Sequence, residues 1–338
     1  MAAEIGERIA VVGGGSWGTA FAAMLAEQHG DVSLWVREPE VCDAIRSGRE
    51  NRAFLPGVKV PEGVLPTTNL GEALAGREIV ALAVPSLHLR DVAEMCVPHL
   101  VPGAVVVSLA KGLENGTLLR MTEVLAQVLP LSRARFAVLS GPTFAREVAR
   151  GMPAGATVAS EDPKVATALQ AVFSGKRFRV YAGTDVTGIE IGGALKNVMA
   201  IAAGMSDGLG FGDNARALLV TRGLAEISRV GVRLGADPQT FYGLSGLGDL
   251  VLTCTGDLSR NRTVGVRVGN GERVADVLAG MTMVAEGVMT AKAAADLSRR
   301  TGVAMPISEQ VHLILHEGKD VRVAVTELLS RALRREKE

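Results

Sequence analysis

The stretch Ile9-Ala-Val-Val-Gly-Gly-Gly-Ser-Trp-Gly18 decides the fold of the first half of the chain. Its four leading apolar residues predict a short strand buried in a parallel sheet. The glycine pattern G-x-G-x-x-G follows. Gly13 permits a tight turn, Gly15 lets a backbone approach a pyrophosphate, and Gly18 lets strand and helix pack closely. A helix is predicted over residues 17–28, with unpaired N–H groups at its start that suit phosphates. Together these features predict a dinucleotide-binding domain.

The end of the second predicted strand, residues 32–36, bears on the choice of cofactor. Arg37 and Glu38 follow it. An acidic residue near this position binds the ribose hydroxyl of NAD, whereas arginine can hold the 2′-phosphate of NADP. Because the basic residue comes first, the sequence favours NADP(H), with NAD(H) use possible through Glu38. A surface charge pair is the competing interpretation, and it competes more strongly for Glu38 than for Arg37.

Further strands are predicted over residues 79–84, 104–109, 136–139, 157–159 and 179–181. The first three run into Pro85, Lys111 and Gly141-Pro-Thr143. Ligands in open α/β sheets bind beyond the carboxyl ends of the strands, so these residues are site candidates. Lys111 could also simply cap a strand end in water. Residues 51–57, with a Pro-Gly turn, predict either a lid or a surface loop.

Strand signals stop after Gly188. Helices are predicted over residues 188–204, 215–234, 288–300, 306–316 and 321–334, and another begins after Asp237-Pro238. On the long helix, Arg222 and Glu226 are expected to pair at i,i+4. The sequence therefore predicts an α/β, Rossmann-type doubly wound domain in residues 1–188, followed by an all-α domain in residues 189–338.

The helix predicted over residues 188–204 carries Lys196 and Asn197 in an otherwise apolar and small sequence. A buried ammonium must be paired, reach water or have a lowered pKa. Those conditions suit a general acid or base. Taken alone, Lys196 is better explained as a lysine on a structural helix whose stem crosses an apolar surface to reach water.

Two polar clusters interrupt the apolar pattern of the second half. Ser245-Gly-Leu-Gly-Asp249 is a glycine-rich turn that presents a carboxylate, and Ser259-Arg-Asn-Arg262 combines two guanidinium groups, an amide and a hydroxyl. The second composition suits a phosphate monoester. The alternatives are a solvated loop and a plain salt bridge between Asp249 and Arg260. Both clusters together with Lys196 favour a functional site.

With these motifs in order, the chain resembles bacterial-type NAD(P)-dependent glycerol-3-phosphate dehydrogenase along nearly its whole length. The resemblance is carried by Gly13-Gly-Gly-Ser-Trp-Gly-Thr-Ala20, Ala83-Val-Pro-Ser86, Ala110-Lys-Gly112, Ser140-Gly-Pro-Thr-Phe-Ala145, Gly192-Gly-Ala-Leu-Lys-Asn197, Gly246-Leu-Gly-Asp249 and Ser259-Arg-Asn-Arg262. The first motif is shared by many dehydrogenases, and the last three in this order are much more specific. Thr143 stands where serine is common in the family, and it keeps the hydroxyl.

The resemblance implies reversible reduction of dihydroxyacetone phosphate to sn-glycerol 3-phosphate, a phospholipid precursor. It makes Lys196 the proton donor and acceptor, with Asp249 keeping it oriented. Substrate contacts are implied for Lys111, Gly141, Thr143, Lys196, Asp249, Ser259, Arg260 and Asn261. Cofactor contacts are implied for Gly13, Gly15, Ser16, Trp17, Gly18, Arg37, Lys111, Ala145, Arg260, Val284 and Glu286. A homodimer is expected by analogy alone.

Composition excludes several other classes. With 36 basic and 36 acidic residues, the net charge of +0 gives no global electrostatic reason to expect nucleic acid or an anionic membrane as partner. Three widely spaced cysteines and scattered histidines predict no metal site and no disulfide framework, and they favour the cytoplasm. The N-terminus lacks an apolar signal region, and no stretch is expected to span a membrane.

Three other functions remain compatible with the residues, and one of them is an oligomeric structural protein with a vestigial site. A two-domain NADP-dependent reductase of another hydroxy or keto acid would also use Arg260 and Lys111, since both suit a carboxylate. A non-catalytic NADPH-sensing protein would need only the first half of the chain. Retention of Lys196, Asn197 and Asp249 argues against that sensor.

Overall fold

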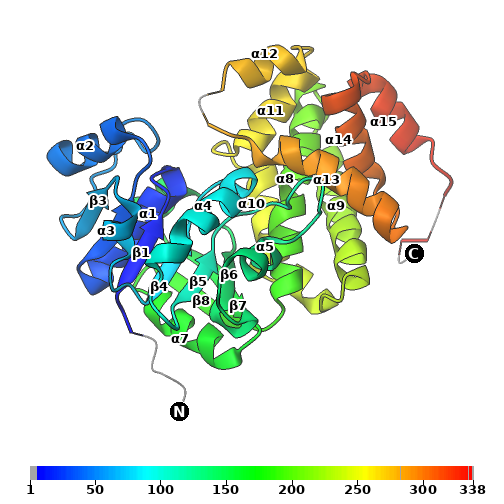
Figure 1. The fold of residues 1–338 in the computed structure, drawn as a ribbon. Helices are drawn as coiled ribbons and strands as arrows, with labels where there is room; N and C mark the ends of the chain where they lie inside the picture. The colour runs from blue at the N-terminus through cyan, green and yellow to red at the C-terminus, as the bar shows by residue number, and fades with distance from the viewer. Residues whose placement is uncertain (1–5, 282, 334, 337–338) are drawn as a thin grey trace.

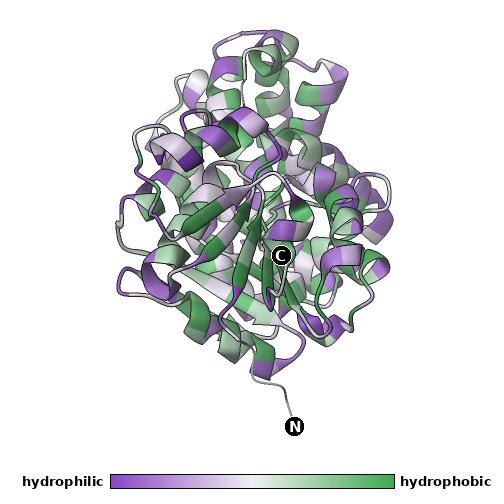
Figure 2. Cartoon of the chain, turned by 60° about the vertical axis from the view of Figure 1, so that its left-hand side comes forward, coloured by the Kyte–Doolittle hydropathy of each residue, from purple (hydrophilic) through white to green (hydrophobic). Residues whose placement is uncertain are grey.

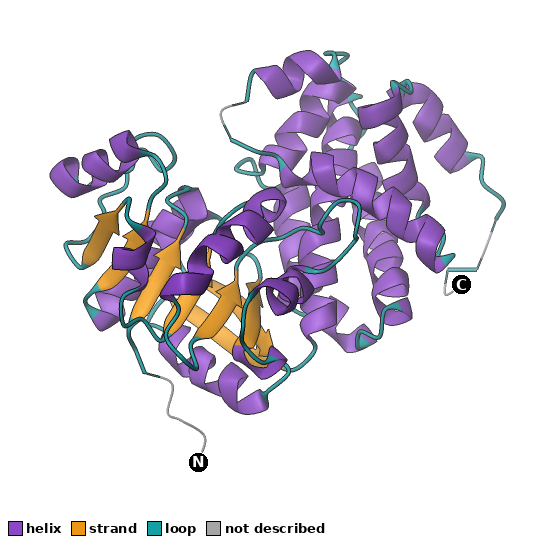
Figure 3. Cartoon of the chain, in the orientation of Figure 1, coloured by secondary structure: helices purple, strands orange, loops and turns teal. Residues whose placement is uncertain are grey.

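The computed structural model describes residues 6–281, 283–333 and 335–336. Its first half is an eight-stranded sheet in the order β3-β2-β1-β4-β5-β6-β7-β8, and its second half is helical (Figures 1 and 3). All neighbouring strands are parallel except β6 and β7. The strands are β1 Ile9–Val12, β2 Val32–Trp35, β3 Val64–Thr67, β4 Ile79–Leu82, β5 Val105–Ser108, β6 Phe136–Ser140, β7 Ala154–Ser160 and β8 Phe178–Gly183.

Both faces of the sheet are covered, which explains why its central strands are apolar throughout. Ile9 and Val11 pack on one face with α1 and α7, whereas Ala10 and Val12 pack on the other with α3, α4 and α5. Figure 2 shows the hydrophobic residues concentrated in these strands. The helices of this half are α1 Ser16–His29, α2 Pro39–Gly48, α3 Leu70–Leu74, α4 Leu89–Cys96, α5 Met121–Val128, α6 Ala145–Ala149 and α7 Pro163–Phe173.

The helical half is built around α8, which is buried almost throughout. Its glycines allow unusually close packing: a Cβ on Gly204 would lie 2.1 Å from the Arg262 carbonyl oxygen, and one on Gly265 would lie 2.1 Å from that of Ile201. A methyl group on either residue would force α8 and α11 apart. The helices are α8 Val186–Gly208, α9 Asp213–Arg233, α10 Asp249–Thr255, α11 Arg260–Gly269, α12 Val274–Ala279, α13 Glu286–Thr301, α14 Pro306–Glu317 and α15 Val321–Leu329.

By length and hydropathy alone, α8 meets the criterion for a membrane-spanning helix. However, 89% of that apolar window is buried inside the protein. The helix packs against α9, α10, α11 and α13 and reaches β6. A core helix surrounded by its own chain explains the composition without a membrane.

The sheet and the helical second half confirm the predicted fold class, with local corrections. β3 was not predicted; it contains Pro66, which an edge strand tolerates. The helix after Asp237 is a short 3-10 helix, Pro238–Tyr242. The expected Arg222–Glu226 pair is wrong, because Glu226 instead accepts the backbone N–H groups of α14. The last helix ends at Leu329, and its predicted end, Arg334, lies outside the described residues.

Candidate active site

One buried carboxylate joins two lysines at the centre of the site. Asp249 begins α10, Lys196 lies in the middle of α8, and Lys111 follows β5. Asp249 Oδ1 lies 2.7 Å from Lys196 Nζ, and Asp249 Oδ2 lies 2.7 Å from Lys111 Nζ. The Asp249 side chain is only 2% exposed, against 7% for Lys196 and 16% for Lys111. The structure therefore brings three of the predicted site residues into direct contact.

This arrangement shifts the pKa values of the two buried groups. Burial lowers the pKa of Lys196 to about 8, and the nearby Lys111 ammonium lowers it too, while Asp249 opposes the shift. Burial raises the pKa of Asp249, but the charges of Lys111 and Lys196 and their hydrogen bonds outweigh it, so this pKa lies below its usual value. A lysine with a pKa this close to neutral can both donate and accept a proton under physiological conditions.

Within the described part of the chain, each lysine ammonium has one N–H donor without a partner. An ammonium has three N–H donors. Lys196 uses two of them, on Asp249 and on Thr253 Oγ1 at 2.8 Å. Lys111 also uses two, on Asp249 and on the Gly141 carbonyl oxygen at 3.0 Å. The remaining donors are available to an oxygen atom bound between the two side chains.

Two asparagines connect the elements around the lysines. Asn197 Nδ2 donates to the Lys111 carbonyl oxygen at 3.1 Å, and Asn261 Nδ2 donates to Asn197 Oδ1 at 2.9 Å. Asn261 Oδ1 in turn accepts the Gly287 N–H at 2.9 Å. This chain of hydrogen bonds ties the loop after β5 to α8, α11 and α13. The Asn261 amide is thus partly committed to structure, and one of its N–H groups has no partner among the residues that the structure describes.

In the cluster Ser259-Arg-Asn-Arg262, some side chains form hydrogen bonds or ion pairs within the protein, whereas Arg260 is exposed and could bind a ligand. Ser259 Oγ accepts the Arg262 N–H at 3.2 Å and caps α11. Arg262 is held by Asp207 at 2.8 Å and by Asp257 at 3.0 Å. Arg260, the first residue of α11, is exposed and does not pair with Asp249 among the described residues. A helix N-terminus beside a guanidinium group suits a phosphate.

The glycine-rich loop after β1 has the geometry that a dinucleotide requires. Gly13 has a φ of +123°, and a Cβ on Gly18 would lie 1.9 Å from the Gly13 carbonyl oxygen. Around Gly15, by contrast, a Cβ would meet nothing within 4 Å. Trp17 Nε1 is buried with no hydrogen-bond partner among the described residues. The open face at Gly15 and this unpaired donor fit a bound dinucleotide.

The segment over residues 51–57 supports that loop. Asn51 is fully buried, and its Nδ2 donates to the Gly14 carbonyl oxygen and to Thr19 Oγ1, each at 2.8 Å. The Phe54 carbonyl oxygen accepts a hydrogen bond from Ser16 Oγ. The segment is therefore a surface loop, as one of the two expectations had it, and Asn51 and Phe54 anchor it to the glycine-rich loop.

The remaining predicted cofactor residues surround the same strand ends. Arg37 follows β2 and is 71% exposed, and it pairs with Glu38 at 2.6 Å. Glu286 Oε1 accepts the Ser86 N–H at 3.2 Å, which brings the start of α13 to the end of β4. Burial raises the pKa of Glu286. The hydrogen bond from the Ser86 N–H and the charge of Arg260 act in the opposite direction but do not outweigh burial. Val284 precedes α13 and is exposed, and Ala145 begins α6.

The chain matches one family along nearly its whole length. Residues 8–166 match the family described as NAD-dependent glycerol-3-phosphate dehydrogenase N-terminus, and residues 185–326 match its C-terminus. A Geobacter sulfurreducens protein named glycerol-3-phosphate dehydrogenase, NAD(P)+, is 54% identical over 332 residues, which cover 98% of this chain and 99% of that protein. The chain belongs to the NAD-dependent glycerol-3-phosphate dehydrogenase family.

Two other members of the glycerol-3-phosphate dehydrogenase family are similar to this chain over nearly its whole length. The Myxococcus xanthus protein of the same name is 53% identical and covers 96% of this chain and 97% of its own length. The crystal structure of glycerol-3-phosphate dehydrogenase from Coxiella burnetii has a TM-score of 0.92 at 38% identity, covering 96% of this chain and 100% of that one. The resemblance seen in the sequence, and with it the prediction of an NAD(P)-dependent enzyme, is confirmed.

The sequence analysis missed two residues that contact the candidate site or support the glycine-rich loop. Thr253 lies one turn after Asp249 on α10, a spacing that could have indicated it once Asp249 was chosen. Asn51 stands in an irregular segment without a motif, and no local signal marks it. In the described part of the chain, no group of three or more His, Cys, Asp or Glu side chains could hold a metal ion.

Proposed function

We propose that this protein reduces dihydroxyacetone phosphate to sn-glycerol 3-phosphate with NAD(P)H, and catalyses the reverse reaction. The observation that carries the proposal is the buried Lys196–Asp249–Lys111 cluster at the carboxyl ends of the strands. It combines a lysine of pKa about 8, a second positive charge and a neighbouring phosphate-type site at Arg260. The product is the backbone precursor of glycerophospholipids.

Proton transfer to the substrate is assigned to Lys196. The nicotinamide cofactor, when bound, supplies the hydride that reduces the ketone carbon. Lys196 Nζ directs its free N–H at the ketone oxygen and gives up that proton as negative charge develops there. Lys111 adds a second positive charge beside the same oxygen. Asp249 holds both ammonium groups in position, and its charge keeps the pKa of Lys196 from falling further.

The phosphate of the substrate is assigned to the start of α11. Arg260, the N–H groups of the first turn, Ser259 and the free N–H of Asn261 supply donors there. Gly141 and Thr143 would contact the substrate from the end of β6. Binding of this remote group orients the ketone toward Lys196. The dinucleotide is assigned to Gly13, Gly15, Ser16, Trp17, Gly18, Arg37, Ala145, Val284 and Glu286, with Lys111 and Arg260 touching both ligands.

The proposal predicts strong selectivity for the phosphorylated ketone. Because the phosphate site contributes to positioning, kcat/KM for dihydroxyacetone should be at least about 100-fold lower than for dihydroxyacetone phosphate. The measurement is the loss of NADPH and NADH absorbance with each ketone. Oxidation with another keto acid but not with the phosphorylated ketone would favour the other reductase. Binding of NADPH without oxidation by any ketone would favour the sensor.

Cofactor preference is assigned to Arg37. Replacing Arg37 with alanine should raise KM for NADPH about tenfold or more and change KM for NADH little, because only NADPH carries the 2′-phosphate. Arg8→Ala is the matched control, since Arg8 forms a similar exposed pair with Glu78 before the amino end of β1. Equal effects of Arg37→Ala on both cofactors would refute the assignment.

Three broader expectations complete the proposal. The protein is expected to be a cytoplasmic homodimer, for which light scattering of the purified chain is the direct measurement of subunit number. Its domains are expected to meet between residues 188 and 189, near the start of α8. Hydrogen–deuterium exchange in which residues 1–188 and 189–338 open as two separate cooperative units would support that boundary.

A further inference from the structure

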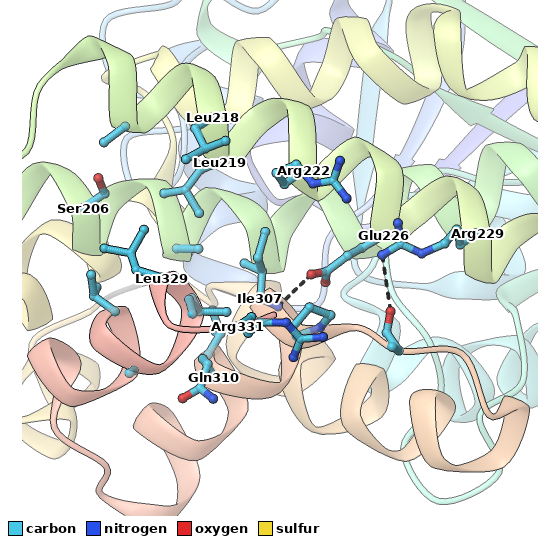
Figure 4. Close-up of a pocket in the computed structure, with 18 of the residues that line it drawn as sticks. Ser206, Leu218, Leu219, Arg222, Glu226, Arg229, Ile307, Gln310, Leu329 and Arg331 are labelled. Atoms are coloured by element: carbon cyan, nitrogen blue, oxygen red, sulfur yellow. Dashed lines mark hydrogen bonds between the residues drawn. The ribbon is translucent and has the colours of Figure 1, made fainter. Parts of the chain in front are cut away.

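A cavity of about 1090 Å³ lies in the helical half, apart from the residues assigned to catalysis. It is bounded by α8, α9, α14, α15 and the described residues 331–333 and 335–336 (Figure 4). Small-molecule sites typically measure about 300–1,000 Å³, so the space is large enough for a ligand. None of the residues assigned above to substrate or cofactor lines it.

The cavity has two chemically different ends, as Figure 4 shows. Leu218, Leu219 and Leu329 gather at one end, while Arg222, Arg229 and Arg331 lie toward the other. The apolar end continues onto side chains that water reaches: Leu218 is 54% exposed and Leu329 is 73% exposed. Exposed leucines that line a recess are typical of a binding surface.

Basic residues outnumber acidic residues in the lining of the cavity. It includes five arginines and two glutamates, namely Arg222, Arg229, Arg233, Arg331, Arg335, Glu226 and Glu336. Glu226 is engaged by the Ile307 N–H at 2.7 Å and by Ser308. Arg222 Nη1 donates to the backbone carbonyl oxygen of Glu336 at 3.3 Å, which leaves its charge unneutralised by that contact. The arginine end therefore attracts an anion.

Two buried polar atoms in the lining also lack partners. Ser206 is 4% exposed, and its Oγ has no hydrogen-bond partner among the described residues. Gln310 Oε1 is also a buried atom with no hydrogen-bond partner among the described residues. Buried polar atoms are normally satisfied, so these two point to a ligand or to water that occupies the cavity.

We infer that this cavity binds a single-chain amphipathic anion, with its aliphatic chain along Leu218, Leu219 and Leu329 and its carboxylate or phosphate head group at Arg222 and Arg331. An apolar helix of a partner would leave the arginines facing an uncharged surface. A second copy of this chain, docked through the same face, would bring two net positive surfaces together. The amphipathic anion matches both ends of the cavity.

The test is calorimetric titration of the full chain with C12 amphiphiles below their micellar concentrations. Laurate and dodecyl phosphate should bind saturably, one per chain, and the tighter of the two identifies the head group. Dodecyl maltoside, which has the same chain and no charge, should bind at least about tenfold more weakly. Equal binding of the neutral amphiphile, or no binding of either anion, would overturn the inference.

Charge-reversal variants test the arginine end. Arg222→Glu and Arg331→Glu should each weaken laurate binding about tenfold or more, because each replaces attraction with repulsion. Arg322→Glu is the matched control: it lies on α15 outside the cavity and should leave binding unchanged. Retained ketone reduction shows that each variant is folded. Unchanged laurate affinity in both folded cavity variants would also overturn the inference.

Discussion

Replacing Lys196 with alanine is expected to lower kcat for dihydroxyacetone phosphate reduction by about 10³-fold or more, while NADPH binding stays nearly intact. The variant loses the proton donor and the positive charge beside the developing alkoxide, and each such contribution is large. The hydrogen bonds of the Lys196 ammonium go to Asp249 and Thr253 on α10, and the glycine-rich loop after β1 is not among its partners. Steady-state kinetics and NADPH fluorescence titration measure the two quantities separately.

The pH dependence of the wild-type enzyme provides the control for this assignment. The pKa of Lys196 is about 8, and reduction needs its protonated form. The rate of reduction should therefore be constant well below this pKa and fall as pH rises through it. Glycerol 3-phosphate oxidation needs the neutral amine and should rise over the same range. Near-wild-type turnover in Lys196→Ala would show that another group transfers the proton.

Local patterns predicted the sheet and the cofactor loop because their physical requirements are local. A buried parallel strand must be apolar, and the turn from Gly13 to Gly18 tolerates no side chain at its ends. The edge strand β3 was not predicted, because its sequence lacks this local pattern. With Pro66 inside it and one neighbouring strand, it lacks the continuous apolar run of the central strands.

The site was harder to predict, because its contacts join distant parts of the chain. Lys111 and Asp249 are separated by 138 positions, so no spacing indicates that they share a hydrogen bond. The same holds for Asn51, which supports Gly14 from 37 positions away. Local patterns had singled out Lys111, Lys196 and Asp249 separately as site candidates, and the family resemblance grouped them into one site. That one carboxylate serves two ammonium groups is visible only in three dimensions.

Glu226 shows how a locally sound pattern can be overridden. The i,i+4 spacing from Arg222 is suitable for a surface ion pair, yet Glu226 is 1% exposed and faces the start of α14. Its carboxylate accepts backbone N–H groups that would otherwise be unsatisfied at that helix end. Burial nevertheless raises its pKa to about 7. The partners of Glu226 are determined by tertiary packing. The helical spacing in the sequence does not reveal them.

Replacing Asp249 with asparagine is expected to lower kcat for reduction by about 10²-fold near neutral pH, through the charge state and orientation of Lys196. Attraction to Asp249 is the largest of the contributions that oppose the lowering of the Lys196 pKa by burial. An amide removes this attraction and leaves two neighbouring ammonium groups uncompensated. It also turns one acceptor into an N–H₂ group that faces a lysine donor. The pKa of Lys196 should consequently fall well below 8.

The pH profile separates this effect from a loss of packing. In Asp249→Asn, the inflection in the rate of reduction should move to lower pH, so the remaining activity should recover as the solution is made more acidic. Glu226→Gln is the matched control, because it neutralises another buried carboxylate of the helical half that touches neither lysine. It should leave the inflection where the wild type has it. A lower kcat with an unmoved inflection in Asp249→Asn would mean that Asp249 orients Lys196 without setting its pKa.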